Sequence, residues 1–219
     1  MTEISPRRVF VTGGTGYMGR RLITDLLGRG HHVQALVRAG SEPKLPRGCP
    51  CVVGDALKAA SYAHHVPPVD TFVQLVGVSH PSPSKAIQFQ EIDLASAKAA
   101  ITAAEQAGVQ HFIYVSVAHP APVMKAYIEV RVAVEAMIRS SGLNATILRP
   151  WYVLGPGHLW PYALKPMYWV LERVPQTRDT ARRLGLFTLE QMISALRGAV
   201  ENPCQGVWVL GVPEIRASG

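Results

Sequence analysis

Short apolar runs alternate with longer amphipathic stretches along almost the whole chain. The apolar runs predict strands at residues 8–12, 32–37, 51–54, 71–76, 111–117, 145–148 and 206–210. Apolar positions at helical spacing predict helices over residues 17–27, 84–107, 125–141 and 188–201, with a shorter one near 164–171. Apolar strands that alternate with helices are typical of a parallel sheet covered on both faces. The pattern therefore predicts an α/β protein with a doubly wound parallel sheet of about seven strands in the order 3-2-1-4-5-6-7.

Local signals mark several of the helix ends. Gly108 and Gly142 follow the second and third helices, at the left-handed position that often ends a helix. The Thr188-x-x-Gln191 spacing predicts a capping box at the start of the last helix. Because the chain has no internal repeat and no low-complexity segment, we expect one domain over residues 1–219. The proline-punctuated residues 151–185 are expected to form a small lid segment on its substrate side.

Composition narrows the possible classes of protein. Hydrophobic residues make up 48% of the chain and charged residues 17%, which excludes an intrinsically disordered chain. The 22 Lys and Arg residues outnumber the 15 Asp and Glu residues, so the net charge is +7. These cations are scattered rather than interleaved with aromatic residues, and we expect no nucleic-acid partner. An anionic small molecule accounts for the charge equally well.

The sequence also lacks the patterns of membrane-spanning, secreted, disulfide-rich and metal-binding proteins. No apolar run approaches about 18 residues and no secretory signal precedes the first strand, so we expect a cytoplasmic protein without a membrane span. Three cysteines are too few for a disulfide framework. Cys49-Pro-Cys51 has no third ligand at metal-site spacing, and we expect no metal.

A glycine-rich turn joins the first strand to the first helix. It reads Gly13-Gly14-Thr15-Gly16-Tyr17-Met18-Gly19. In such a turn the first glycine permits the tight bend, the second lets the backbone approach a pyrophosphate, and the third lets the helix pack on the sheet. The free N–H groups and the dipole of the helix start then face the phosphates. A dinucleotide site is the favoured interpretation, and a turn with only a structural role is the alternative.

The Gly-x-x-Gly-x-x-Gly spacing resembles that of the extended and atypical short-chain dehydrogenase/reductase superfamily, especially its short NmrA-like and epimerase-like members. Further motifs match this superfamily in order: Ala35-Leu36-Val37-Arg38, Gly54-Asp55, Tyr114-Val115-Ser116, Ser141-Gly142-Leu143 and Leu148-Arg149-Pro150. Together they span nearly the whole chain. The resemblance implies a Rossmann fold, an NAD(P) cofactor and oxidoreductase or epimerase-type chemistry.

The resemblance also implies which residues bind the cofactor. They are Gly13, Thr15, Gly16, Tyr17, Met18, Gly19, Arg38, Asp55, Ala56, Val76, Gly77, Pro150, Tyr152 and Val153. NAD-binding members usually carry an acidic residue at the tip of the second strand, whereas this tip is Arg38 and the nearest acid is Glu42. A guanidinium suits a 2′-phosphate, so we expect NADP(H) to be preferred over NAD(H). Arg38 as an ordinary solvated side chain is the alternative, and Asp55 either binds the adenine amino group or caps the next helix.

Relatives in this superfamily use a Ser or Thr near the fifth strand and a Tyr-x-x-x-Lys pair on the following helix. Ser116 matches the first, and Tyr127-Ile-Glu-Val-Arg131 matches the pair with arginine in the lysine position. The i, i+4 spacing places Tyr127 and Arg131 on one helix face. The resemblance implies that Ser116, Tyr127 and Arg131 are catalytic, with the tyrosine as proton donor. An arginine supplies a permanent charge but does not relay a proton.

Each of these three residues also has a plain structural interpretation. Ser116 then caps a strand end, and Tyr127 is a half-buried aromatic on a helix. Arg131 is a surface cation, with Glu135 as its partner at i+4.

Loops after the fourth, fifth and sixth strands meet at the carboxyl edge of the sheet, where such folds bind ligands. The candidates for contact with the substrate are His80, His119, Trp151, His158 and Trp160. Their aromatic character indicates a small, partly apolar substrate.

Two functions from different classes follow. The first is an NADP(H)-preferring oxidoreductase or epimerase-type enzyme acting on a small carbonyl or alcohol, as a monomer or homodimer. The second is a non-catalytic protein that binds the dinucleotide for sensing or assembly, as some NmrA-like relatives do. Ser116 and Tyr127 favour the first, and Arg131 in place of lysine favours the second. About 70 residues follow Pro150, which is short for the substrate lobe of a nucleotide-sugar epimerase.

Overall fold

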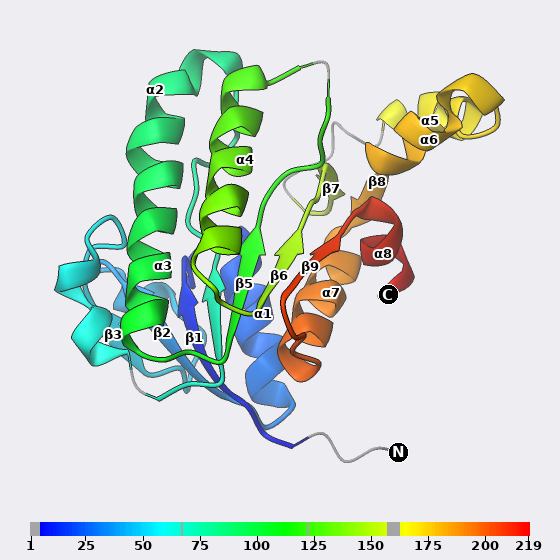
Figure 1. Ribbon diagram of the computed structural model, residues 1–219. Helices are drawn as coiled ribbons and strands as arrows, with labels where there is room; N and C mark the ends of the chain where they lie inside the picture. Colours follow the sequence, from blue (N-terminus) through cyan, green and yellow to red (C-terminus); the bar gives the residue numbers. More distant parts are fainter. Residues whose placement is uncertain (1–4, 67, 122, 157–162) are drawn as a thin grey trace.

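The computed structural model describes residues 5–66, 68–121, 123–156 and 163–219. Its centre is a seven-stranded sheet in the order β3-β2-β1-β4-β5-β6-β9, with every pairing parallel (Figure 1). The strands are β1 (Arg8–Thr12), β2 (His32–Val37), β3 (Cys51–Val53), β4 (Thr71–Gln74), β5 (His111–Val115), β6 (Ala145–Leu148) and β9 (Val207–Leu210). The predicted doubly wound sheet and its strand order are confirmed.

Helices cover both faces of this sheet. They are α1 (Tyr17–Gly28) and α7 (Leu189–Glu201) on one face, and α3 (Ala95–Gln106) and α4 (Lys125–Ser140) on the other (Figure 1). Alternation along β1 accounts for the two layers of the core. Val9 and Val11 pack in one cluster with α1 and α7, whereas Phe10 packs in the other with α3 and α4. Because both faces are covered, the central strands are mostly apolar, and their few polar residues, such as Gln74 and Thr146, are buried as well.

The prediction of one helix over residues 84–107 is wrong. The segment is divided into the 3₁₀ turn η4 (Pro83–Lys85), the short α2 (Ala86–Gln88), the π-helix η5 (Phe89–Leu94) and α3. A π-turn contains more residues than an α-turn, so it changes which side chains face inward. Phe89 and Asp93 are the buried residues of η5. A carboxylate thereby enters the interior, which helical periodicity does not predict.

Apart from the short helix expected near residues 164–171, the short elements have no counterpart in the sequence prediction. β7 (Tyr152–Leu154) and β8 (Leu186–Thr188) form a separate parallel pair. Between β7 and β8 in the sequence lie α5 (Lys165–Leu171), which matches the expected short helix, and α6 (Pro175–Arg183) (Figure 1). The last helix, α8 (Val212–Ala217), follows β9. The remaining turns of 3₁₀ helix are η1 (Glu42–Lys44), η2 (Ala59–Ser61) and η3 (Ala63–His65). Elements of three residues carry too little periodicity to be recognised. The assignment of residues 151–185 to a lid stays a prediction.

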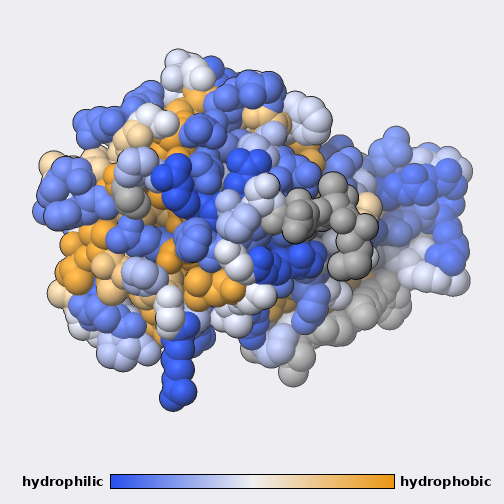
Figure 2. All heavy atoms as spheres, turned by 90° about the horizontal axis from the view of Figure 1, so that it is seen from below, coloured by the Kyte–Doolittle hydropathy of each residue, from blue (hydrophilic) through white to orange (hydrophobic). Residues whose placement is uncertain are grey.

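The part that carries α5 and α6 projects to one side of the molecule. Figure 2 shows this part at the right as mainly hydrophilic, with apolar groups gathered on the opposite side. The sequence of α6 explains the colour, because Pro175–Arg183 contains three arginines and an aspartate and, apart from its proline, has no aliphatic residue larger than alanine. Within the described ranges, no helix is both long and apolar enough to cross a membrane.

The start of α7 has the predicted capping box. Thr188 Oγ1 accepts a hydrogen bond from the Gln191 N–H at 3.2 Å, and the Thr188 N–H donates to Gln191 Oε1 at 2.9 Å. Two N–H groups at the start of the helix are thus satisfied, which defines the boundary between β8 and α7. Gly108 and Gly142 adopt the left-handed conformation expected after a helix, with φ of +61° and +75°.

His111 begins β5 at the amino edge of the sheet, and its side chain is fully buried. Its Nε2 atom lies 3.0 Å from Thr146 Oγ1 and 3.7 Å from Cys204 Sγ. Burial removes the hydration that a charged imidazole needs, and together with the charge of Arg7 it lowers the pKa of His111 from 6.5 to about 4. The histidine is therefore neutral in the folded protein near neutral pH.

This depressed pKa predicts a loss of stability in acid. Unfolding releases His111 to its ordinary pKa, so below pH 6.5 the unfolded state binds the extra proton and the free energy of unfolding falls. We expect a loss of about 3 kcal/mol between pH 6.5 and pH 4 from this residue. Denaturant unfolding across that range should show a flatter dependence for His111→Gln. His64→Gln, which changes an exposed histidine, should keep the wild-type slope, and equal slopes for all three proteins would contradict this role of His111.

Candidate functional site

The glycine-rich turn has the close backbone packing that excludes larger residues. Gly13 has φ of +76°, and a Cβ there would lie 2.8 Å from the carbonyl carbon of Leu75. A Cβ on Gly19 would overlap the Gly13 carbonyl oxygen. Gly16 is the N-cap of α1, and no side chain of the described residues caps that helix. The uncapped N–H groups of the first turn and the close-packed glycines fit the pyrophosphate of a dinucleotide.

Arg38 and Asp55 follow β2 and β3 at the same carboxyl edge of the sheet. The Arg38 side chain is exposed, and its guanidinium has no hydrogen bond or ion pair with the described residues. The Asp55 carboxylate accepts from the Leu57 N–H at 3.0 Å and lies 4.0 Å from Lys58 Nζ. One carboxylate oxygen therefore closes a local turn, and Asp55 keeps acceptor capacity for a ligand.

The other residues expected at the cofactor lie along the same edge. Thr15, Tyr17 and Met18 belong to the turn and the start of α1, Ala56 follows Asp55, Val76 and Gly77 follow β4, and Pro150, Tyr152 and Val153 lie before and within β7. The Pro150 carbonyl accepts from the Ala118 N–H at 2.8 Å, which holds the loop after β6 against the loop after β5.

Tyr127 and Arg131 share one face of α4, as their spacing predicts. The guanidinium carbon of Arg131 lies 4.9 Å from the centre of the Tyr127 ring. The half-buried Tyr127 ring also contacts Phe89 of η5, with ring centres 5.0 Å apart. A permanent cation therefore lies against the aromatic ring of the candidate proton donor.

Arg131 is buried rather than exposed, so its interpretation as a surface cation paired with Glu135 is wrong. Its guanidinium pairs with Asp93 of η5, and Nη1 also donates to Tyr114 Oη at 3.0 Å and to the Val115 carbonyl at 2.9 Å. The Arg131 Nε atom is buried with no hydrogen-bond partner among the described residues. The reason for the change of partner is η5, because its wide turn directs Asp93 inward to where the guanidinium lies.

Charge and burial act against each other in this cluster. Burial alone would lower the pKa of Arg131, but Tyr114, Tyr127 and Asp93 raise it above its ordinary value, so the guanidinium stays charged. Burial raises the pKa of Asp93, although Arg131 opposes the shift. Burial also raises the pKa of Tyr114 to about 12, which keeps this phenol protonated as an acceptor for Arg131.

The loop after β4 packs directly on the buried pair. A Cβ on Gly77 would lie 2.7 Å from Arg131 Nη2 and 2.9 Å from Asp93 Oδ1. The Val78 N–H donates to Asp93 Oδ2 at 2.9 Å. The pair thus joins α4 to the backbone beside the expected cofactor site, and only glycine leaves room for this contact.

A second polar cluster surrounds Ser116, just after β5. The Ser116 hydroxyl donates to Glu135 Oε1 at 2.6 Å, and Arg149 Nε donates to the same oxygen at 3.0 Å. His119 Nε2 lies 3.4 Å from that oxygen. Burial favours a protonated Glu135, but the hydrogen bonds from Arg149 and Ser116 outweigh it and hold the pKa of Glu135 below its ordinary value. Glu135 is thus a buried carboxylate that holds the Ser116 hydroxyl.

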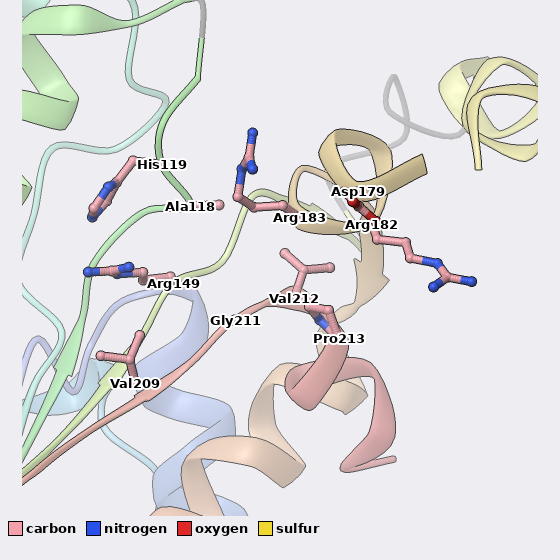
Figure 3. A pocket seen from close by; sticks show the side chains of 10 residues that line it. All are labelled: Ala118, His119, Arg149, Asp179, Arg182, Arg183, Val209, Gly211, Val212 and Pro213. Carbon is pink, nitrogen blue, oxygen red and sulfur yellow. The ribbon is translucent and has the colours of Figure 1, made fainter. Parts of the chain in front are cut away.

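The candidates for contact with the substrate lie in different places. His119 lines a cavity of about 370 Å³ together with Arg149 (Figure 3). His80 is exposed, and its carbonyl accepts from Lys85 Nζ at 3.1 Å. Trp151 packs on Tyr152 with ring centres 5.2 Å apart. His158 and Trp160 lie outside the described residues.

Sequence reasoning did not identify Asp93 or Arg149 as members of the site, and it placed Glu135 with the wrong partner. Arg149 stands in the Leu148-Arg149-Pro150 motif, so its position was visible but not its contact. Glu135 lies one helical turn after Arg131, and this spacing could have indicated a place on the same buried face. Asp93 gave no signal, because the π-turn that buries it has no recognised sequence pattern.

Comparison with known proteins places these features in a wider group. Residues 13–156 match the model of a protein family described as NAD(P)H-binding. A 3-beta-hydroxysteroid dehydrogenase of Mycolicibacterium neoaurum is 34% identical over 117 residues, which cover 49% of this chain and 31% of that protein. The Photosystem II assembly factor Ycf39 of Cyanophora paradoxa is 26% identical over 148 residues, which cover 64% of this chain and 44% of that protein.

Solved structures share the fold over nearly the whole chain. The Bordetella bronchiseptica enzyme WbmH, solved in complex with NAD+, matches 94% of this chain and 76% of its own with a TM-score of 0.71 and 19% identity. At that identity the likeness concerns the fold alone. The chain spans less than half the length of the two curated relatives described above.

Two glycines of α1 provide a matched test of the turn. Gly19→Ala is expected to weaken dinucleotide binding by at least about tenfold, because the new methyl group forces the Gly13 carbonyl out of place. A Cβ on Gly28 meets nothing within 4 Å, so Gly28→Ala should bind the dinucleotide as the wild type does. Gly28→Ala should also raise the free energy of unfolding by about 0.5–1 kcal/mol. Calorimetric titration with NADPH measures both variants, and wild-type affinity in Gly19→Ala would exclude the turn from the site.

Proposed function

From the premise that the chain belongs to the NAD(P)H-binding family, we propose that it is an NADP(H)-preferring oxidoreductase that acts through Tyr127. Membership of this family confirms the resemblance to the short-chain dehydrogenase/reductase superfamily. Its substrate is a small carbonyl compound or the corresponding alcohol. The observation that carries the proposal is the Arg131 guanidinium held 4.9 Å from the centre of the Tyr127 ring.

A fixed cation beside a phenol favours transfer of its proton. Negative charge develops on the phenol oxygen as the proton leaves, and a preorganised positive charge stabilises it without having to move. Arg131 stays charged because Asp93 and the two neighbouring tyrosines raise its pKa. Tyr127 then donates its proton to the oxygen of a carbonyl substrate, or accepts one from an alcohol in the reverse direction.

The cofactor residues fit a nicotinamide dinucleotide. The glycine-rich turn and the uncapped start of α1 hold the pyrophosphate, and Asp55 accepts from the adenine amino group. When bound, the nicotinamide supplies the hydride that reduces a carbonyl, or takes it back from an alcohol. Ser116 lies after β5 on the side of Tyr127's helix, and it orients a carbonyl substrate by donating its hydroxyl hydrogen to the substrate oxygen in place of Glu135.

Preference for NADP(H) rests on Arg38. Its exposed guanidinium stands at the tip of β2 with no acidic partner among the described residues, so it is free to pair with a 2′-phosphate. Charged hydrogen bonds of this kind contribute about 1.5–3 kcal/mol. NADPH should therefore bind more tightly than NADH by this amount. Arg38→Ala should remove the difference and leave NADH affinity unchanged, so NADH serves as the internal control in a calorimetric titration. Equal affinities for the two dinucleotides in the wild type would contradict the preference.

A second candidate function is supported by the same contacts. The Ser116 hydroxyl already donates to Glu135, and the Arg131 guanidinium already donates to Asp93, Tyr114 and Val115. Groups engaged in this way bind a ribose or a substrate only by exchanging partners. This favours a non-catalytic dinucleotide-binding protein with a role in sensing or assembly, and one relative described above is named an assembly factor.

Tyr127→Phe separates the two functions. NADPH consumption with a panel of small ketones, aldehydes and quinones should fall by at least about a hundredfold, since positioned proton transfer contributes about 10²–10⁴-fold. Tyr62→Phe is the control, because Tyr62 is buried elsewhere and its hydroxyl has no hydrogen-bond partner among the described residues. Arg131→Lys keeps the charge and should retain turnover.

The possible outcomes of this assay are distinct. Turnover that survives Tyr127→Phe unchanged would remove Tyr127 from the chemistry. NADPH binding without turnover of any compound by the wild type would instead favour the non-catalytic function.

A further inference from the structure

The cavity beside His119 lies at the carboxyl edge of the last strands of the sheet (Figure 3). Its walls come from the loops after β5, β6 and β9, from the start of α8 and from α6. The lining residues are Ala118, His119, Arg149, Asp179, Arg182, Arg183, Val209, Gly211, Val212 and Pro213. The glycine-rich turn belongs to the other half of the same edge, after β1. The cavity therefore lies away from the expected pyrophosphate site, and it adjoins Pro150, whose carbonyl accepts from the Ala118 N–H, and the loop that carries Ser116.

The two sides of this cavity differ in chemistry. Ala118, Val209, Val212 and Pro213 make an apolar wall, whereas three arginines and one aspartate make a charged one. Its volume of about 370 Å³ admits a small organic molecule. Such a lining fits a ligand with an apolar body and a polar, negatively charged end.

The three arginines are not equivalent. Arg149 is already neutralised, because it forms two hydrogen bonds with the buried Glu135 carboxylate. Figure 3 shows the Arg182 guanidinium directed away from the other lining residues. Arg183 lies between His119 and α6, with its guanidinium turned away from Arg149 and Val209. A ligand that reaches this side of the cavity therefore meets Arg183 rather than either of the other two arginines.

Arg183 also lacks the partners that a half-buried guanidinium needs. Its Nε atom is buried with no hydrogen-bond partner among the described residues. Its Nη2 atom reaches Thr180 Oγ1 at 3.5 Å, the limit of a hydrogen bond, and no ion pair of Arg183 occurs within the described ranges. A buried donor without an acceptor is unfavourable, and a half-buried guanidinium without an internal counterion is available to pair with an oxyanion through its exposed part.

We propose that this cavity binds the substrate and that the substrate is a small carboxylic acid, whose carboxylate pairs with Arg183 while its apolar body lies on Val209 and Val212. A singly charged carboxylate matches the single guanidinium of Arg183, since Arg149 is neutralised and Arg182 is directed away, whereas a dianionic phosphate calls for more than one. This inference rests on the proposed function and adds the class of substrate to it. The net charge of +7 on the chain further favours the approach of an anion.

Matched compounds test the proposal through turnover. With NADPH, 4-carboxybenzaldehyde should be reduced with a kcat/KM at least about tenfold above that of 4-formylbenzamide, its neutral analogue of similar size. In both Arg183→Ala and Arg183→Gln, kcat/KM for 4-carboxybenzaldehyde should fall to the value for 4-formylbenzamide. Arg178→Ala is the control, because it removes an exposed arginine of the same helix that does not line the cavity. Thermal unfolding confirms that each variant is folded.

A binding measurement separates this inference from the proposed function. In calorimetry on the protein without dinucleotide, 4-(hydroxymethyl)benzoate should bind at least about tenfold more tightly than 4-(hydroxymethyl)benzamide. This difference in affinity should disappear in Arg183→Gln. Acid binding that depends on Arg183, without turnover of any aldehyde, would support the anion cavity and contradict the oxidoreductase function.

Four results would overturn the inference itself. One is equal binding of acid and amide, and another is an equal loss in Arg183→Gln and Arg178→Ala. The third is binding of inorganic phosphate more tightly than of the carboxylate, which would make the cavity a phosphate site. Failure of both compounds to bind up to about 10 mM would likewise exclude a carboxylate pocket.

Discussion

The buried ion pair between Asp93 and Arg131 is the interaction on which the candidate site depends. The two side chains are 0% and 7% exposed, so each charge has lost its water and relies on the other. Removal of one partner from such a pair costs about 3–5 kcal/mol, because the remaining charge stays buried and unpaired. The pair holds η5 to α4 and to the end of β5, and it places the Arg131 guanidinium against the Tyr127 ring.

A chain of polar contacts extends this constraint through the sheet. The Thr12 hydroxyl at the end of β1 bonds to the Gln74 side chain, and Gln74 Nε2 donates to Ser96 Oγ at 3.1 Å. Ser96 in turn donates to the Asp93 carbonyl at 3.2 Å. The strand before the glycine-rich turn and the helix of Tyr127 are thus joined through a chain of buried hydrogen bonds that ends at Arg131, whose Nε lacks a partner among the described residues. Such a network resists rearrangement, because an alternative arrangement leaves further buried polar groups unpaired.

α4 presents a second carboxylate–guanidinium pair one turn further along. Glu135 joins Ser116 and Arg149, and so links the loop after β5 to the loop after β6. The contrast with Arg183 is informative, because Arg131 and Arg149 have their counterions inside the protein while Arg183 has none within the described ranges. Guanidinium groups of the first kind organise the site, and a group of the second kind is available to a ligand. This difference in partners, rather than the number of arginines, distinguishes the scaffold from the proposed substrate cavity.

Sequence alone determined the doubly wound sheet, its strand order and the glycine-rich turn, since these follow from local periodicity and from steric limits on single residues such as Gly13 and Gly19. The placement of Tyr127 and Arg131 on one face followed from helical spacing in the same way. Only the tertiary structure decided the partners of the charges. Asp93 reaches Arg131 from 38 positions away through a π-turn, and Arg149 takes Glu135 from across the sheet edge. Such partners depend on which elements pack together and on how much water is excluded between them, and no local pattern records either.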